Sequence, residues 1–332
     1  MKPVDSFGVH PIRTIRSGRF WWRVIRYLVP VLILGTIFAK VEWRQLQTIL
    51  GQADYRLIVA AFVLQLGPVL LQGWRWQVLL QSDGNAWPWL WVQIIHLEAG
   101  FFDAFVPGRV GSDMYRLTLV PAGRRHHAAA SLLLMRLQGL VINFSAFVIA
   151  ALFWFGADLQ QHATMVSIMG ITLAGMFGTI LLLVWKGLPV LKVSSDTPGL
   201  LGRLAGHGNQ VLEAIRVSGR RPRLLWNTSL ISMGFVLLNS LIFMLVGRAF
   251  GMIIPWSLFM VGSPAIMLMA LLPFSIQGRG PAELVALFFW HEIGGASTEQ
   301  VILVSLGVFA INMLHCLLAG LLVVWRARKL KK

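Results

Sequence analysis

Two kinds of residue are scarce in this sequence of 332 residues. It contains one cysteine, Cys316, which excludes an internal disulfide. Charged residues make up 13% of the chain, about half of their share in a typical soluble domain. Apolar residues make up 57%, and the mean hydropathy is +0.71, which is more than a soluble core requires. The composition therefore predicts an all-α polytopic membrane protein that forms one integral membrane domain over residues 1–332.

Acidic residues are the scarcer of the two charge types. Thirteen acidic residues face 29 basic ones, which gives a formal net charge of +16. The basic residues cluster beside apolar segments, where they would meet anionic lipid headgroups and set the orientation of the chain. No folded basic domain accompanies this charge, so we expect no nucleic acid partner.

Apolar segments divide the chain into eight parts. Basic residues from Arg13 to Arg26 precede the first segment, and no small-x-small cleavage site follows it, so we interpret it as an uncleaved span rather than a signal peptide. All eight are apolar, and some need not cross the membrane. They cover residues 27–39, 57–73, 87–106, 128–155, 163–185, 224–246, 253–276 and 301–325.

The basic clusters between these segments predict the topology. They fall at the N-terminus, at residues 124–125, along the loop 186–223 and at residues 326–332, so all four sites should be cytoplasmic. The segment 87–106 must then return to the side from which it entered, and so must the later segment that contains residues 278–280. We expect about six full crossings, two oppositely oriented re-entrant helical hairpins, an amphipathic loop at 186–223 and both termini in the cytoplasm.

Polar residues interrupt the apolar sequence at two places, one in each expected hairpin. Both interruptions carry Gly-Arg, followed by an acid on the fourth residue after the arginine. Hydrocarbon solvates neither irregular backbone nor charge, so such segments lie inside protein or beside a water-filled cavity. The first holds Pro107, Gly108, Arg109, Gly111 and Asp113, and the second holds Pro273, Ser275, Gly278, Arg279, Gly280 and Glu283.

The spacing of the two interruptions predicts an internal repeat. Gly108 and Gly278 lie 170 residues apart, and the apolar segments before and after them are offset by nearly the same distance. Residues 20–160 and 161–326 would then form two repeats, the second inverted because each contains three crossings. Chance agreement of spacing among many apolar segments is the alternative.

Four short motifs carry a resemblance to a known family. Residues 111–116 (Gly-Ser-Asp-Met-Tyr-Arg) resemble a Gly-Gly-Asp-x-x-Arg motif, and residues 134–139 (Leu-Met-Arg-Leu-Gln-Gly) resemble Asp-Arg-Leu-x-Gly. The dipeptide Arg75-Trp76 and the second interruption, residues 273–283, are similar to further motifs in the same order. Together they resemble the lysylphosphatidylglycerol synthase transmembrane family, also called flippase-like proteins.

The resemblance implies a function in the bacterial inner membrane. Relatives move amphiphilic lipids between leaflets, so an anionic or zwitterionic membrane lipid is the expected substrate. Forked hydrogen bonds from arginine suit its phosphate, and glycine and proline would let the hairpin backbone approach the headgroup and bend. The phosphate-binding candidates are Arg109, Arg116, Arg136 and Arg279, with Asp113, Ser275 and Glu283 also facing substrate; Pro107, Gly108, Gly111, Pro273, Gly278 and Gly280 are the hinge candidates.

Some positions depart from the family pattern. Met135 stands where the family often has an acid, which leaves Arg136 needing Asp113 or a lipid phosphate as its partner. Ala282 stands where the family commonly has an arginine, and Arg279 would replace that arginine only if it points into the same cavity. An ion pair that merely fixes a hairpin is the alternative role for any single arginine.

Two further groups of residues are open to more than one interpretation. His96 and Glu98 are candidates for a proton site, with pairing of Glu98 to a nearby arginine as the equal alternative. We also predict interhelical hydrogen bonds from Asn143, Asn239, Asn312 and His315.

Catalytic motifs are absent from the sequence. We find no metal-binding cluster, nucleophile elbow or phosphate-binding glycine loop, and nothing beyond Trp325 to supply a soluble catalytic domain, so we expect no enzyme activity, metal or cofactor. A membrane-embedded transferase with Asp113 or Glu283 as its base is one alternative. A non-transporting scaffold for a separately encoded lipid synthase is the other. The sequence predicts neither the lipid, its energy coupling nor the oligomeric state.

Overall fold

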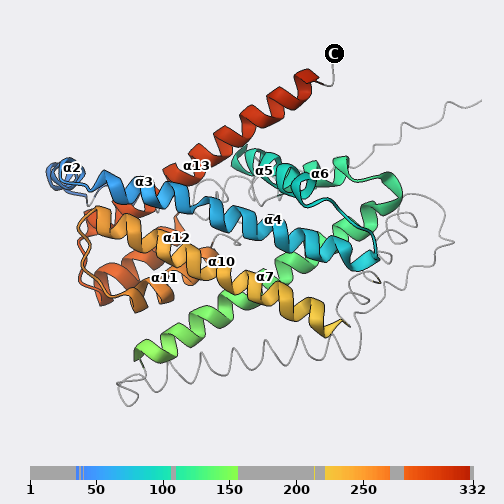
Figure 1. Cartoon of the computed structure of the whole chain (residues 1–332). Coiled ribbons are helices and arrows are strands. Elements are labelled where there is room, and N and C mark those ends of the chain that lie inside the picture. Colours follow the sequence, from blue (N-terminus) through green and yellow to red (C-terminus); the bar gives the residue numbers. More distant parts are fainter. Residues whose placement is uncertain are drawn as a thin grey trace, which may run out of the picture.

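The computed structural model describes residues 41–105, 110–155, 221–269 and 280–329, together with residues 35, 36, 39 and 213. Within these residues the secondary structure is helical, which confirms the predicted all-α class (Figure 1). The predicted first and fifth apolar segments and the loop 186–223 lie almost wholly outside the described residues.

Four helical stretches are long and apolar enough to cross a bilayer. They are Tyr55–Leu80, Ala122–Phe155, Pro222–Ala249 and Thr298–Arg326. Each matches one of the predicted crossings. The first combines α3 (Tyr55–Leu64) with α4 (Leu66–Leu80), and the second contains the short η3 (Ala122–Arg124) and α7 (Arg125–Phe155). The others are α10 (Pro222–Ala249) and α13 (Thr298–Lys329).

The first of these stretches corrects a predicted boundary. The apolar segment was predicted to end at residue 73, because the charged Arg75 follows it. In the structure α4 continues to Leu80. Arg75 is buried and its guanidinium donates to side-chain and backbone oxygens, so the charge does not end the helix. The stretch is divided into α3 and α4 at Gln65, where the side-chain Nε2 donates to Asn312 Oδ1 on α13 at 2.7 Å.

Shorter helices flank the two interruptions. On the first side α5 (Trp89–Phe105) packs against α6 (Val110–Leu119), with residues 106–109 between them. On the second side α11 (Trp256–Met269) packs against α12 (Pro281–Ala286), which continues as a π-helix, η5 (Leu287–Ile293). The remaining elements are α2 (Trp43–Gly51) and η1 (Gln81–Asp83).

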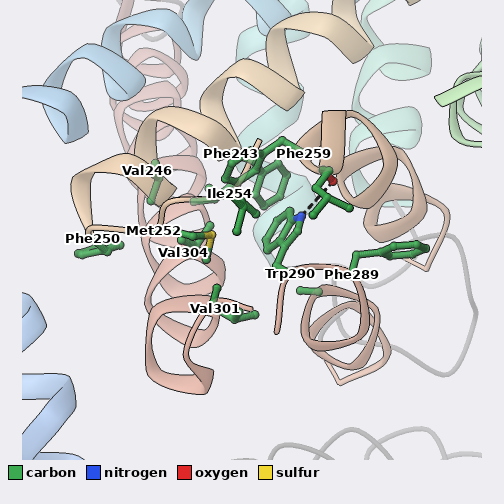
Figure 2. Close-up of a cluster of buried hydrophobic side chains, with 14 of the residues drawn as sticks. Phe243, Val246, Phe250, Met252, Ile254, Phe259, Phe289, Trp290, Val301 and Val304 are labelled. Carbon is green, nitrogen blue, oxygen red and sulfur yellow. Dashed lines mark hydrogen bonds between the residues drawn. The ribbon is translucent and has the colours of Figure 1, made fainter. Parts of the chain in front are cut away.

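Two apolar clusters hold these helices together. The larger one joins α10, α11, α12, η5 and α13, and its centre is the fully buried Trp290 with Phe243 and Phe259 around it (Figure 2). The indole Nε1 of Trp290 donates to Leu258 O at 3.2 Å, so its polar atom is satisfied. The smaller cluster lies where α4, α5 and the start of α7 meet, around Trp76. The helices that flank the two interruptions therefore belong to two different apolar clusters.

One sequence prediction about polar residues is largely wrong. Asn143 and Asn239 were expected to bond between helices, but each side-chain Nδ2 donates to a carbonyl four residues earlier in its own helix, at 2.8 Å. His315 Nδ1 likewise donates to the carbonyl of Ile311 in its own helix, at 2.9 Å. Of the four residues, Asn312 makes the interhelical bond that the structure describes, with Gln65. An asparagine in an apolar helix can reach its own preceding turn, and that contact needs no partner helix.

Candidate functional site

A charged cluster lies at the surface of α6 that faces α5 and α7. Asp113 and Arg116 stand three residues apart on α6, so they share one helix face. Arg116 Nη1 donates to Asp113 Oδ1 at 3.2 Å, and Arg116 Nη2 lies 3.1 Å from His96 Nδ1 on α5. Because arginine stays protonated, His96 Nδ1 accepts this bond, which places the proton of a neutral His96 on Nε2.

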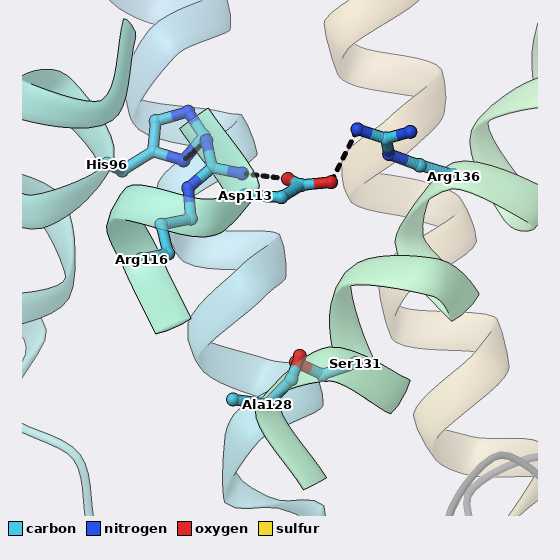
Figure 3. A network of polar contacts seen from close by, with 6 residues as sticks. All are labelled: His96, Asp113, Arg116, Ala128, Ser131 and Arg136. Carbon is cyan, nitrogen blue, oxygen red and sulfur yellow. Dashed lines mark hydrogen bonds and ion pairs between the residues drawn. The ribbon is translucent and has the colours of Figure 1, made fainter. Parts of the chain in front are cut away.

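Arg136 approaches the same carboxylate from α7. Its Nη2 forms an ion pair with Asp113 Oδ2, so Asp113 bridges two guanidinium groups that point at it from opposite sides (Figure 3). Of the two partners that the sequence left open for Arg136, the structure contains Asp113. The side chain of Arg136 is 39% exposed, whereas that of Arg116 is 6% exposed. Arg136 is thus the arginine of this cluster that an incoming anion can reach.

Two of the sequence motifs meet beneath Arg136. Arg75 on α4 is 3% exposed, and its Nη2 donates to the carbonyl of Met135 and lies 3.5 Å from Gln138 Oε1. Its guanidinium rests on Gly139, where an added Cβ would lie 3.5 Å from Nη1. That distance is an ordinary van der Waals contact, so the guanidinium of Arg75 lies against the last residue of the second motif without requiring a glycine there.

Gln138 extends this contact to a third helix. Its Nε2 lies 2.8 Å from both Thr228 Oγ1 and Ser229 Oγ on α10. From the sequence, Gln138 was predicted only to be part of the motif at residues 134–139. Thr228 and Ser229 were not predicted as its partners. The spacing of residues along a helix does not predict such a bond, because the bond depends on which helices are neighbours in space.

Glu98 on α5 forms a second charged contact. Its side chain is 1% exposed, and its Oε2 accepts from Tyr115 of α6 and from Arg326 of α13, each at 2.8 Å. Pairing with an arginine was one of the two predicted roles for Glu98, and the structure contains it. Arg326 was not predicted as the partner, because it belongs to the basic cluster at residues 326–332. That cluster was interpreted only as a signal for the cytoplasmic side of the membrane. Tyr115 was also missed.

Glu283 of α12 is a buried acid of the second half. Its Oε2 accepts from the backbone N of Gly280 at 2.6 Å, and its Oε1 accepts from Ser305 Oγ of α13 at 2.9 Å. Gly280 has a φ of +90°, which an L side chain rarely adopts, so a glycine is needed where the chain turns into α12. Pro281 then begins the helix at a position that requires no N–H.

The structure brings only some of the predicted residues together. Asp113, Arg116, Arg136 and His96 form one cluster, Glu98 lies on the same helix pair, and Glu283 belongs to the second half. Gly111 lies in the first turn of α6. The candidates outside the described residues are Pro107, Gly108, Arg109, Pro273, Ser275, Gly278 and Arg279.

One helix contacts a buried acid in each half of the chain. Ser305 and Arg326 of α13 bond to Glu283 and Glu98, respectively. They are separated by 21 residues, or about 32 Å of helix at 1.5 Å per residue. That length is close to the thickness of the hydrocarbon core, about 30 Å. The two buried acids therefore lie toward opposite ends of a membrane-spanning helix.

The chemistry of the cluster suits an anion rather than a metal. Across the described residues, no group of three or more His, Cys, Asp or Glu side chains is placed to hold a metal ion. Asp113, Arg116 and Arg136 together carry a net positive charge, and both cations are guanidinium groups, which bind phosphate through parallel hydrogen bonds.

Comparison with known protein families gives a match that covers most of the chain. The family model described as the lysylphosphatidylglycerol synthase TM region matches residues 23–320. That range includes the charged cluster and every candidate residue named from the sequence. No curated protein matches the chain.

Proposed function

The chain belongs to the lysylphosphatidylglycerol synthase transmembrane family, and from that premise we propose that it moves an anionic or zwitterionic phospholipid between membrane leaflets. The family supports a lipid-related role in the membrane. Four long apolar helices support an integral membrane protein.

The observation that carries the proposal is the bridge made by Asp113. One carboxylate holds two guanidinium groups, and one of them, on Arg136, is substantially exposed. A lipid phosphate offers the same kind of oxygen acceptor as the carboxylate. The phosphate would replace Asp113 at Arg136, while Asp113 stays bonded to Arg116.

This exchange gives Asp113 a defined part in the transport cycle. When no lipid is bound, the carboxylate neutralises Arg136, whose charge would otherwise be costly beside hydrocarbon. When a phosphate arrives, one charged hydrogen bond replaces another. Arg136 therefore has an anionic partner both before and after the headgroup binds. For this reason the headgroup can bind and leave with only a small change in free energy.

The helix lengths support the two re-entrant hairpins. Within the described residues α5, α6 and α11 have 17, 10 and 14 residues, or about 26, 15 and 21 Å. These lengths fall short of the hydrocarbon core of about 30 Å. The distance between the two acids along α13 supports entry of the hairpins from opposite faces. The inverted repeats 20–160 and 161–326 and the cytoplasmic placement of both termini belong to the same proposal.

The remaining candidates extend the headgroup path. Arg109 and Arg279 would offer further phosphate contacts, and Ser275 and Glu283 would face the headgroup from the second hairpin. Bending would occur at the glycines and prolines of both interruptions. His96 and Glu98 are the proposed proton site. The bacterial inner membrane is the proposed location, and the transport reaction needs no cofactor.

Leaflet exchange in liposomes tests the proposal. Purified protein is reconstituted with phosphatidylglycerol that carries a fluorophore on one acyl chain, and a membrane-impermeant reductant then quenches the outer leaflet. We expect quenching beyond the outer-leaflet share with wild type, and loss of this excess with Arg136→Gln. Arg248→Gln is the matched control, because Arg248 donates to the carbonyls of Met252 and Ile254 in the second half.

Each other outcome selects a different function. A chemically altered lipid, detected by mass spectrometry of the same liposomes, would indicate a membrane-embedded transferase. Neither exchange nor product, across anionic and zwitterionic lipids, would leave a scaffold for a lipid synthase. Native mass spectrometry of co-purified lipids then identifies the headgroup.

A further inference from the structure

Arg75 and Trp76 are consecutive residues of α4 that contact two different helices. Neighbouring positions on an α-helix point about 100° apart, so the two side chains serve different faces. Arg75 bonds to α7 at Met135 O, and Trp76 lies under Arg116 of α6. These are the two helices that supply the arginines on either side of Asp113.

The Trp76 contact sets the place of Arg116. The guanidinium carbon of Arg116 lies 5.4 Å from the centroid of the Trp76 ring, within the range of a cation–π interaction. Trp76 is fully buried in the smaller apolar cluster with Leu80 and Ile95, so its ring has no room to turn. Arg116 therefore rests on a fixed aromatic surface while it donates to Asp113.

The Arg75 contact sets the place of Arg136. Arg75 donates to the carbonyl of Met135, the residue directly before Arg136, and to the amide oxygen of Gln138. Its other recorded acceptor is Gln72 Oε1 at 3.5 Å, so every acceptor of this buried cation among the described residues is neutral. A guanidinium kept for an ion pair would be expected to meet a carboxylate. Here it holds the backbone of α7 at the base of Arg136.

We infer that Arg75 and Trp76 are positioning residues that set the spacing of the Arg116 and Arg136 guanidinium groups for a headgroup phosphate. The inference rests on the proposed function, because it takes the phosphate to replace Asp113 at Arg136 while Arg116 holds Asp113. Neither residue touches the lipid in this arrangement. Both act through the arginine that they support, one through its side chain and the other through its backbone.

Binding of a soluble anionic lipid tests the inference. The probe is phosphatidylglycerol with six-carbon acyl chains, added to full-length protein in detergent, and the neutral comparison is the diacylglycerol with the same chains. We expect Trp76→Leu and Arg75→Gln to raise the Kd for the anionic probe about threefold to thirtyfold, the range that a desolvated cation–π contact commands. The Kd for the neutral probe should not change.

The chain offers a matched control for each variant. Trp87 belongs to the same apolar cluster as Trp76 and carries the guanidinium of Arg124 at 5.7 Å, away from Asp113. Trp87→Leu should therefore lower thermal stability without changing the Kd for the anionic probe. Arg248→Gln serves in the same way for Arg75→Gln, because Arg248 also donates to backbone carbonyls.

Conservative variants separate positioning from bulk packing. Trp76→Phe keeps an aromatic face in the same space, so it should raise the Kd less than Trp76→Leu and more than Trp87→Phe. Arg75→Lys keeps a donor for Met135 O and should recover part of the affinity that Arg75→Gln loses. If Trp76→Leu does not fold, the comparison of Trp76→Phe with Trp87→Phe decides the matter.

The results separate this inference from the proposed function. Equal Kd values for Trp76→Leu and Trp87→Leu, or an equal loss for the anionic and neutral probes, would overturn the positioning role while leaving translocation intact. The expected pattern of Kd values in a protein that exchanges no lipid in liposomes would uphold the positioning role and reject translocation. If wild type binds neither the anionic probe nor phosphatidylcholine with the same six-carbon chains, both are overturned. If it binds only the phosphatidylcholine, the same comparison of Kd values is made with that probe.

Discussion

The region around the first interruption and the second half of the chain differ in how they are stabilised. The first region contains Asp113 between two arginines, Glu98 bonded to Arg326, and the buried cation of Arg75. Its apolar cluster is small. The second half is packed around Trp290 and its aromatic neighbours, and Glu283, one of its buried acids, accepts from a backbone N–H and a hydroxyl.

The difference matters because the two kinds of contact respond differently to a ligand. A charged hydrogen bond can pass from one acceptor to another, as from a carboxylate to a phosphate, with little net change in free energy. A close-packed aromatic cluster has no second arrangement of similar energy. The first region is therefore suited to exchange of partners and the second to rigidity.

The largest predicted effect comes from the packed half. Trp290→Ala should reduce the free energy of unfolding by about 3–5 kcal/mol, because it leaves a cavity and removes the bond to Leu258 O. Loss of folded protein on heating in detergent measures it. Phe153→Ala, at a side chain that is 84% exposed, is the control. Similar losses for the two variants would show that the second half is not the rigid part.

The next effect comes from the contact between α5 and α13. Glu98→Gln removes the charge that Arg326 pairs with and should reduce the free energy of unfolding by about 1–3 kcal/mol. Because Arg326 is one third exposed, added salt should shrink the difference from wild type. Thermal unfolding at two salt concentrations measures both, with the exposed Glu292→Gln as control. A salt-independent loss would count against the ion pair.

A smaller effect is expected at the corresponding contact of the second half. Ser305→Ala removes one hydroxyl that donates to Glu283, which keeps its bond from the Gly280 backbone, so the loss should be about 1 kcal/mol. Ser232→Ala, at a hydroxyl that bonds within its own helix, controls for loss of the oxygen. If Ser305→Ala costs more than Glu98→Gln, the proposed contrast between the halves is reversed.

The smallest effect on stability should accompany the largest effect on transport. Arg136→Gln should reduce the free energy of unfolding by less than about 1 kcal/mol, because a partly exposed ion pair contributes little. Arg116→Gln should cost more, since Arg116 is almost fully buried. Thermal unfolding and leaflet exchange on the same samples measure the two quantities. A large loss of stability with normal exchange for Arg136→Gln would make it a structural residue.

The fold class and four crossings were predictable because composition and segment length reflect the bilayer directly. The ion pair between Arg136 and Asp113 was one of two options, since both motifs could be placed near the first hairpin. The partner of Glu98 could not be predicted, because Arg326 lies 228 residues away in the sequence. The sequence does not show which helices are neighbours of the helix that carries it. Arg75 was recognised as part of a motif, yet its bond to Met135 O uses a backbone atom that every residue has.

The contacts of α13 with both acids limit how the two halves can move. An α-helix neither stretches nor shortens appreciably, so the points at Ser305 and Arg326 keep a fixed separation along its axis. While both bonds are made, Glu98 and Glu283 keep that separation along the axis, so the helices that carry them move together. Independent motion requires one of the bonds to break, and the weaker hydroxyl bond of Ser305 would be the first to release.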